Sequence, residues 1–105
     1  MVEPSKKDWK LFREKIGGWQ ERYMEKLVKE YADFLYSDQP ASVKFWEMEK
    51  RIKRDRKKPG VCIELRKSDM FWDIAGLIKD KVISEDDLEE FSDDLKEAVA
   101  LILKR

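Results

Sequence analysis

The chain has 105 residues, of which 42% are hydrophobic and 44% charged, and its 23 Lys and Arg residues balance its 23 Asp and Glu residues. This length corresponds to one domain with a single core, so we expect residues 1–105 to fold as one unit. Histidine is absent and Cys62 is the only cysteine, which excludes an internal disulfide, a zinc site and catalysis by histidine.

The composition predicts an all-α fold. Only four Gly and three Pro residues interrupt the chain, and amphipathic helices combine a packed core with a large charged fraction. We expect a compact bundle of four main helices, preceded by a short helix over residues 5–16. No segment approaches the ~18 apolar residues of a membrane span, and residues 1–10 lack the apolar run of a signal peptide. We therefore expect a cytoplasmic protein that does not bind membranes.

The first half of the chain predicts two successive helices. Ser5 is a natural N-cap for the first, with Asp8 three residues on. The pair Gly17-Gly18 predicts a break or bend after this helix. We therefore expect the short helix to be loosely attached to the rest of the bundle. The second helix covers about residues 19–36, and its wide apolar arc predicts a central core helix between two neighbours.

The next helix carries the densest positive charge in the protein. Ser42 is its predicted cap, and Phe45, Met48 and Ile52 lie on one side at helical spacing, which predicts a buried stripe that ends near Ile52. Seven of the nine residues from 50 to 58 are basic. We expect these last turns to project beyond the core.

A turn is predicted at residues 59–60, and the segment that follows is ambiguous. Residues 61–67 permit a helix, a strand or a loop: their apolar residues alternate as in a strand, but a strand needs a partner. We favour a helix that starts at Val61 or near Ser68. The early start would place apolar residues on two opposite faces, which indicates an interface. The candidates for self-association are Val61, Leu65, Trp72 and Leu101.

The last helix has the clearest local signals. Ser84 is its predicted cap and Asp87 sits three residues on, as in a capping box. Its apolar stripe consists of Leu88, Phe91, Leu95, Ala98 and Ile102. Its many carboxylates fall mainly on the outer face, where they have neither the burial nor the close opposition of a catalytic pair. We expect no catalytic residue, no metal or cofactor site and no small-molecule ligand.

Charge is divided unevenly along the chain. Residues 1–58 hold 16 Lys and Arg against 11 Asp and Glu, whereas residues 59–105 hold 7 against 12. The basic helix can contact phosphates, with a tryptophan stacked on a base, or it can be neutralised by the acidic last helix of the same chain or of a second copy. The candidate contacts for a nucleic acid or an acidic partner are Trp46, Lys50, Lys53, Arg54, Lys57 and Lys58.

Three stretches of the chain resemble a known group of proteins: GWQERYMEKLVKEYADFL, KFWEMEKRIKRDRKKPGV and VISEDDLEEFSDDLKEAV. They are similar to short, uncharacterised bacterial all-helical proteins, some of which carry an automatic "multidrug transporter" label. That label conflicts with the sequence, because no segment here can span a bilayer. The resemblance covers most of the chain and implies no known functional residues.

Together these patterns predict a small bacterial interaction or regulatory protein that acts by binding rather than catalysis. A homodimer would bury the spare apolar positions and set basic helices against acidic ones. The alternative is a nucleic-acid-associated accessory protein that uses the basic helix over residues 46–58.

Overall fold

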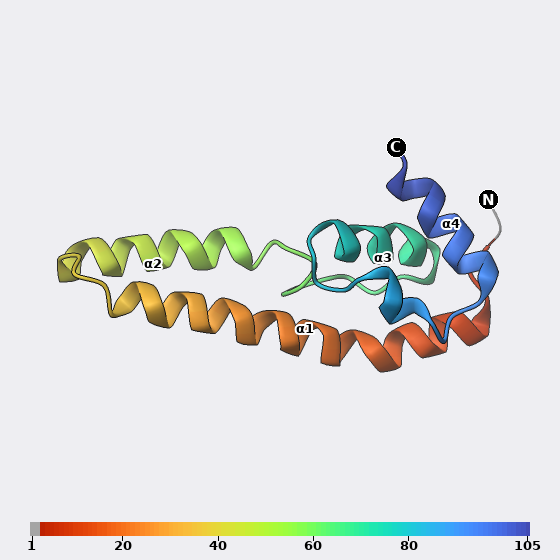
Figure 1. The fold of residues 1–105 in the computed structure, drawn as a ribbon, viewed down its shortest axis with the longest axis horizontal. Coiled ribbons are helices and arrows are strands. Elements are labelled where there is room, and N and C mark those ends of the chain that lie inside the picture. Colours follow the sequence, from red (N-terminus) through yellow and green to blue (C-terminus); the bar gives the residue numbers. More distant parts are fainter. Residues whose placement is uncertain (1–2) are drawn as a thin grey trace.

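The computed structural model describes residues 3–105 (Figure 1). Within them the regular structure is entirely helical, which confirms the all-α prediction with four main helices. The helices are α1 (Lys6–Leu35), α2 (Ala41–Asp55), α3 (Met70–Lys79) and α4 (Asp93–Leu103), with the 3-10 helices η1 (Lys67–Asp69) and η2 (Glu85–Leu88). None of the helices in this part of the chain is both long and apolar enough to cross a membrane.

The predicted separation of a short N-terminal helix is wrong, because α1 continues through Gly17 and Gly18. Each glycine in a helix interior costs up to about 1 kcal/mol relative to alanine. Phe12, Ile16 and Trp19 are nevertheless spaced so that they share one side of a continuous helix. All three are buried in the same core. A break between them would remove Trp19 from that core, and its burial outweighs the two glycines.

The first half of α1, α3 and α4 form a globular part, which we call the head and define as residues 3–23 and 60–105. The helices α3 and α4 pack against each other. On α1, Trp19 packs near the start of α4, since its ring centroid lies 6.3 Å from that of Phe91, just before that helix. The buried core consists of Phe12, Ile16, Trp19, Met70, Phe71, Ile74, Ala75, Leu77, Ile83, Leu88, Phe91, Leu95, Ala98, Val99 and Ile102.

The predicted last helix is divided into two pieces. The capping box at Ser84 is confirmed, since the backbone N–H of Ser84 donates to Asp87 Oδ2 at 2.9 Å. The chain then forms only η2, and α4 starts after a second cap, Ser92, whose Oγ accepts from the N–H of Leu95 at 3.2 Å. The predicted apolar stripe is buried in full despite this break.

The ambiguous segment 61–66 is a loop, so the helix predicted to start at Val61 is wrong and the later start is close to the observed one. The preceding glycine, Gly60, is buried where the loop enters the head. A Cβ atom at this position would overlap the ring of Tyr23 and lie 2.8 Å from Cγ2 of Val82. The chain therefore needs glycine here for close approach rather than for a special backbone angle.

The second half of α1 and all of α2 form an antiparallel hairpin that extends away from the head (Figure 1). We call this hairpin the arm and define it as residues 24–59. The molecule measures 53 × 25 × 21 Å with a radius of gyration of 16.6 Å, whereas a compact chain of this length has about 13 Å. The helical bundle is therefore less compact than predicted. The central core helix predicted over residues 19–36 is wrong, because beyond Leu27 the arm buries no apolar side chain.

Candidate interaction surfaces of the helical arm

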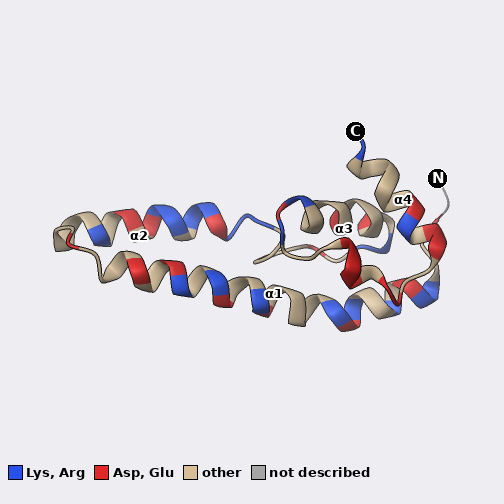
Figure 2. Cartoon of the chain, viewed as in Figure 1, with Lys and Arg blue, Asp and Glu red and all other residues tan. Residues whose placement is uncertain are grey.

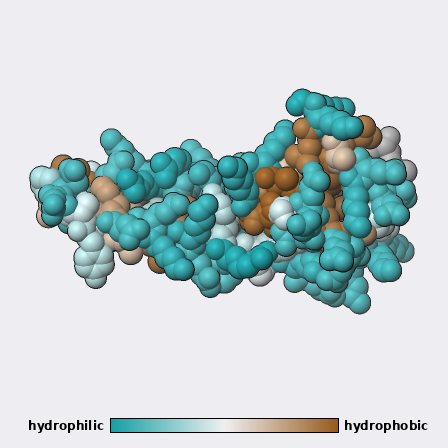
Figure 3. All heavy atoms as spheres, viewed as in Figure 1, coloured by the Kyte–Doolittle hydropathy of each residue, from teal (hydrophilic) through white to brown (hydrophobic). Residues whose placement is uncertain are grey.

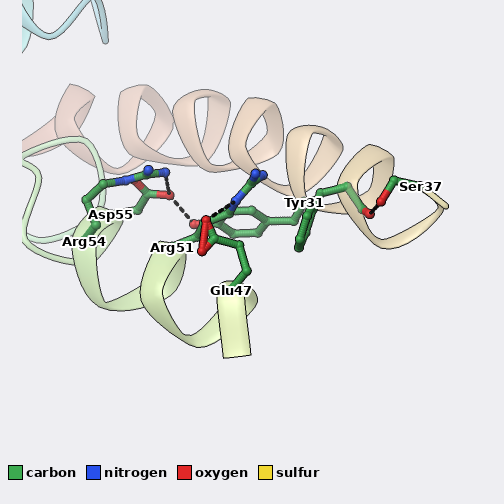
Figure 4. A network of polar contacts seen from close by, with 7 residues as sticks. Tyr31, Ser37, Glu47, Arg51, Arg54 and Asp55 are labelled. Carbon is green, nitrogen blue, oxygen red and sulfur yellow. Dashed lines mark hydrogen bonds and ion pairs between the residues drawn. The ribbon is translucent and has the colours of Figure 1, made fainter. Parts of the chain in front are cut away.

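A buried carboxylate joins the two helices of the arm (Figure 4). Asp55, at the end of α2, has a side chain that is only 2% exposed. Its Oδ2 accepts from the Tyr31 hydroxyl of α1 at 2.5 Å. Its Oδ1 lies 3.0 Å from Arg54 Nε and 3.4 Å from Lys58 Nζ. A buried charge is tolerated only when it is paired and hydrogen-bonded in this way.

The contacts of this network shift the pKa values of both partners. The hydrogen bond from Arg54, joined by the one from Tyr31, lowers the pKa of Asp55 to about 2. Burial, with the hydrogen bond to Asp55, raises the pKa of Tyr31 to about 12. Both values move away from neutral pH, whereas a general acid or base works best with a pKa near the operating pH.

The rest of the hairpin is also joined by polar contacts. The Arg51 guanidinium lies 4.0 Å from the centroid of the Phe34 ring on α1, and its Nε is 3.8 Å from Glu47 Oε1. At the turn, the Ser37 hydroxyl donates to the Phe34 carbonyl at 2.6 Å (Figure 4). The predicted cap at Ser42 is wrong, because the N-cap residue is Pro40, two residues earlier, and it makes no side-chain cap hydrogen bond.

The apolar stripe predicted to be buried in α2 is on the surface instead. Phe45 and Ile52 are exposed and Met48 is half-buried. These three side chains and Leu35 of α1 line a shallow groove along one side of the hairpin. We call the set Val28, Leu35, Phe45, Met48 and Ile52 the apolar face of the arm. Helices normally bury such a face, so its exposure marks a candidate interaction surface.

The residues predicted to contact phosphates lie on and beyond another side of α2. Trp46, Lys50, Lys53, Arg54 and Lys57 are exposed, and Lys58 is half-buried. The helix ends at Asp55, so the last two lysines belong to the turn that follows rather than to the predicted helix. Trp46 packs edge-on against Phe45, with ring centroids 5.0 Å apart.

Three of these five cations already have a carboxylate partner. Lys53 pairs with Glu49 at 3.5 Å, and both Arg54 and Lys58 contact Asp55. Lys50 and Lys57 form no ion pair within residues 3–105. These two lysines are the most available for an external anion.

Figure 2 shows the acidic residues of η2 and α4 in the head, apart from the basic helix α2 in the arm. Glu90 pairs with Lys15 at 3.0 Å and Asp87 with Arg22 at 3.7 Å, so this acidic segment contacts basic residues of α1. The acidic helix α4 packs on α3 in the head. The positive charge of α2 is therefore not covered by the acidic part of the same chain.

The candidates for self-association in the head occupy two places. Trp72 and Leu101 lie on the surface of the α3–α4 pair. The Arg105 guanidinium is 5.3 Å from the Trp72 ring, and Leu101 lies in the last turn of α4, four residues before that arginine, which follows the helix. Leu65 is exposed and Val61 half-buried, both in the loop 61–66. Figure 3 shows apolar residues at the surface of the head.

Two carboxylates were not recognised as special from the sequence. Asp55 had one signal, since it is the only acidic residue within the basic run 50–58. Asp73, in the first turn of α3, has a buried Oδ2 without a hydrogen-bond partner. Burial, with the negative charge of Asp69 nearby, raises the pKa of Asp73 to about 6. No group of three potential metal ligands occurs within residues 3–105.

Comparisons with family models, curated proteins and solved structures give no match for this chain. The resemblance to short bacterial proteins therefore remains an expectation from the sequence. The fold defines the protein as all-α, with a globular head and a projecting helical hairpin.

Proposed function

We propose that this protein is a non-catalytic interaction module and that the arm is its docking element. The observation that carries the proposal is the missing core of the arm: α2 and the facing half of α1 are helical, yet their large apolar side chains remain at the surface. The two helices of the arm contact each other without burying these side chains, so the apolar face stays open. A partner protein that covers this face would bury its apolar side chains.

Binding rather than catalysis is supported by the state of the carboxylates. Asp8 and Asp55, the two buried ones, are fully occupied by structural hydrogen bonds. Asp73 has a pKa near neutral, but the chain contains no histidine with which a carboxylate could form an acid–base pair. We therefore propose that the protein has no catalytic activity, and that it works in the bacterial cytoplasm on a second copy or on another protein.

The experiment that tests this proposal asks whether binding to other proteins depends on the arm or on the head. The tagged chain is cross-linked in its native cell and captured, alongside a double variant of the arm, Phe45→Glu with Ile52→Glu, and a head variant, Leu101→Glu. We expect the associated proteins, including further copies of the chain, to be lost with the arm variant and kept with the head variant. If the arm variant keeps every association of the wild type, the arm is not the docking element.

A second candidate function is nucleic-acid contact through residues 46–58. The observation that favours it is the exposure of Lys50 and Lys57 without ion pairs, beside the exposed Trp46. Lysines at this spacing can neutralise phosphates while the indole stacks on a base. Titration with labelled single- and double-stranded DNA and RNA at low and moderate salt tests this candidate. Binding that weakens with salt and with Lys50→Ala and Lys57→Ala is expected, and absence of binding at low salt would exclude it.

A further inference from the structure

The apolar face of the arm has no internal partner within residues 3–105. Val28 is 61% exposed, Leu35 45%, Phe45 66% and Ile52 48%, although each lies in a regular helix or at its end. Large side chains left this open present several hundred Å² of apolar surface, the range in which a patch marks an interaction site. The head buries a core of its own, whereas beyond Leu27 the arm buries no apolar side chain.

These residues form one continuous face across both helices. Val28 and Leu35 are seven residues apart, which places them on the same side of α1. Phe45, Met48 and Ile52 follow one side of α2 at i, i+3 and i+7. The groove that Leu35 lines together with those three residues joins the two sides into one surface. The face therefore has the shape of one layer of a four-helix bundle.

The two edges of this face carry opposite charge. Residues 19–38 of α1 and its turn hold five acidic and three basic side chains, whereas residues 41–60 hold eight basic and three acidic ones. Glu25 precedes Val28 by three residues, so it lies beside the face on α1. On α2 the groove is lined by Lys44, Lys53 and Arg56, together with one acid, Glu49. A surface with one acidic and one basic edge is complementary to itself.

We propose that the occupant of this face is a second copy of the chain, and that two arms pack into a four-helix bundle with their heads at the same end. This inference rests on the proposed role of the arm as docking element and names its partner. A two-fold axis parallel to the arms sets α1 of one copy on α2 of the other. Each acidic edge then meets a basic edge.

The hydrogen bonds within the arm indicate which residues of α1 and α2 lie at the same height along it. Tyr31 reaches Asp55, and the Gln20 side chain donates to the Pro59 carbonyl at 3.0 Å. Glu25 therefore lies at about the level of residues 56–58, and in the proposed dimer it faces Arg56 of the second copy. With the heads at opposite ends, α2 would lie on α2 instead, and the two basic helices would repel each other.

Sedimentation of the purified chain over a range of concentrations tests whether the second copy is the partner. We expect twice the 12.6 kDa mass of one chain, reduced to the monomer mass by Phe45→Glu with Ile52→Glu and unchanged by Leu101→Glu. Circular dichroism checks that the arm variant keeps its helices. A monomer at all concentrations, or a dimer that is broken by Leu101→Glu and not by the arm variant, would overturn the inference. Arm-dependent capture of a different protein by a monomeric chain would overturn it while leaving the proposed function intact.

Charge reversal tests the arrangement of the two arms. Glu25→Lys is expected to weaken the dimer roughly fivefold, as for repulsion between exposed charges at the rim of an interface. Adding Arg56→Glu to the same chain restores the opposite charges in both symmetric contacts and should recover the affinity. Rescue of this kind supports the arrangement with both heads at one end. If the double variant is weaker than Glu25→Lys alone, the two residues do not face each other and this arrangement is wrong.

Discussion

The carboxylate of Asp8, in the first turn of α1, accepts hydrogen bonds from both donors of Ser92, the N-cap residue of α4. The backbone N–H of Ser92 lies 3.1 Å from Asp8 Oδ1, and the hydroxyl lies 2.5 Å from Oδ2. The predicted cap of α1 is confirmed, since Ser5 Oγ accepts from the N–H of Asp8 at 3.1 Å. The Asp8 carboxylate itself binds Ser92 instead of completing a capping box with Ser5. This contact joins the starts of the first and last helices.

We predict that Asp8→Ala destabilises the protein by about 1–3 kcal/mol, because it leaves the donors of Ser92 without their buried acceptor. Urea unfolding followed by circular dichroism measures this free energy. The control is Asp93→Ala, an exposed acid in the first turn of α4, which should cost about 0.3–1 kcal/mol through the helix dipole alone. Equal losses for the two variants would mean that the contact between Asp8 and Ser92 contributes nothing specific.

The glycines of α1 should tolerate alanine, and the glycine at the base of the arm should not. A Cβ atom at Gly17 or Gly18 has no neighbour within 4 Å. Each Ala substitution there should stabilise the protein by about 0.5–1 kcal/mol, by reducing the freedom of the unfolded chain. Gly60→Ala should cost about 1–3 kcal/mol, because the new methyl group would displace Tyr23 and Val82.

Thermal melting of the three glycine variants measures these changes. A rise in melting temperature for the two α1 variants would agree with one uninterrupted helix. A fall for both would show that the glycines serve a bend that α1 needs.

The contact between Tyr31 and Asp55 should make the arm sensitive to both extremes of pH. The folded pKa of Asp55 is lowered from 3.8 to about 2, so its stabilisation is complete above the unfolded pKa and is lost as pH falls from about 4 towards 2. The folded pKa of Tyr31 is raised from 10.0 to about 12, so its stabilisation is complete below pH 10 and is lost as pH rises towards 12.

Helical content as a function of pH, together with phenolate absorbance, checks these two ranges. In Tyr31→Phe the loss at high pH that belongs to this residue should disappear, and the acidic loss should remain because Arg54 still pairs with Asp55. An unchanged alkaline transition in this variant would assign it to another group.

Asp73 should have the opposite dependence on pH. Its folded pKa is raised from 3.8 to about 6, so its contribution to stability is largest below the unfolded pKa and is lost as pH rises through about 6. Asp73→Asn removes the desolvated charge and should therefore raise the melting temperature at about pH 7 while having little effect at about pH 4. Asp69→Asn, which removes only the neighbouring charge, should have a smaller effect in the same direction. Equal effects of Asp73→Asn at both pH values would contradict this account.

The sequence by itself determined the all-α class of the fold and the apolar stripe near its C-terminal end. The stripe from Leu88 to Ile102 is buried as its spacing predicts, and Ser5 and Ser84 cap helices as their local patterns predict. These features depend on neighbours within a few residues, which the sequence displays directly. The second cap, Ser92, is followed by two acidic residues, which is a typical cap pattern. It was missed because the apolar spacing of the stripe continues across it.

Only the tertiary structure decided which amphipathic helices are buried. The stripe of Phe45, Met48 and Ile52 has the spacing of a core stripe, and periodicity cannot tell whether such a stripe faces its own chain or a partner. The same limit applied to the charges, because the acidic segment near Asp87 and Glu90 meets Lys15 and Arg22 of α1 rather than the basic helix. Contacts between distant segments depend on how α1 extends through its glycines into the arm, and that path is set by the burial of Trp19 in the head.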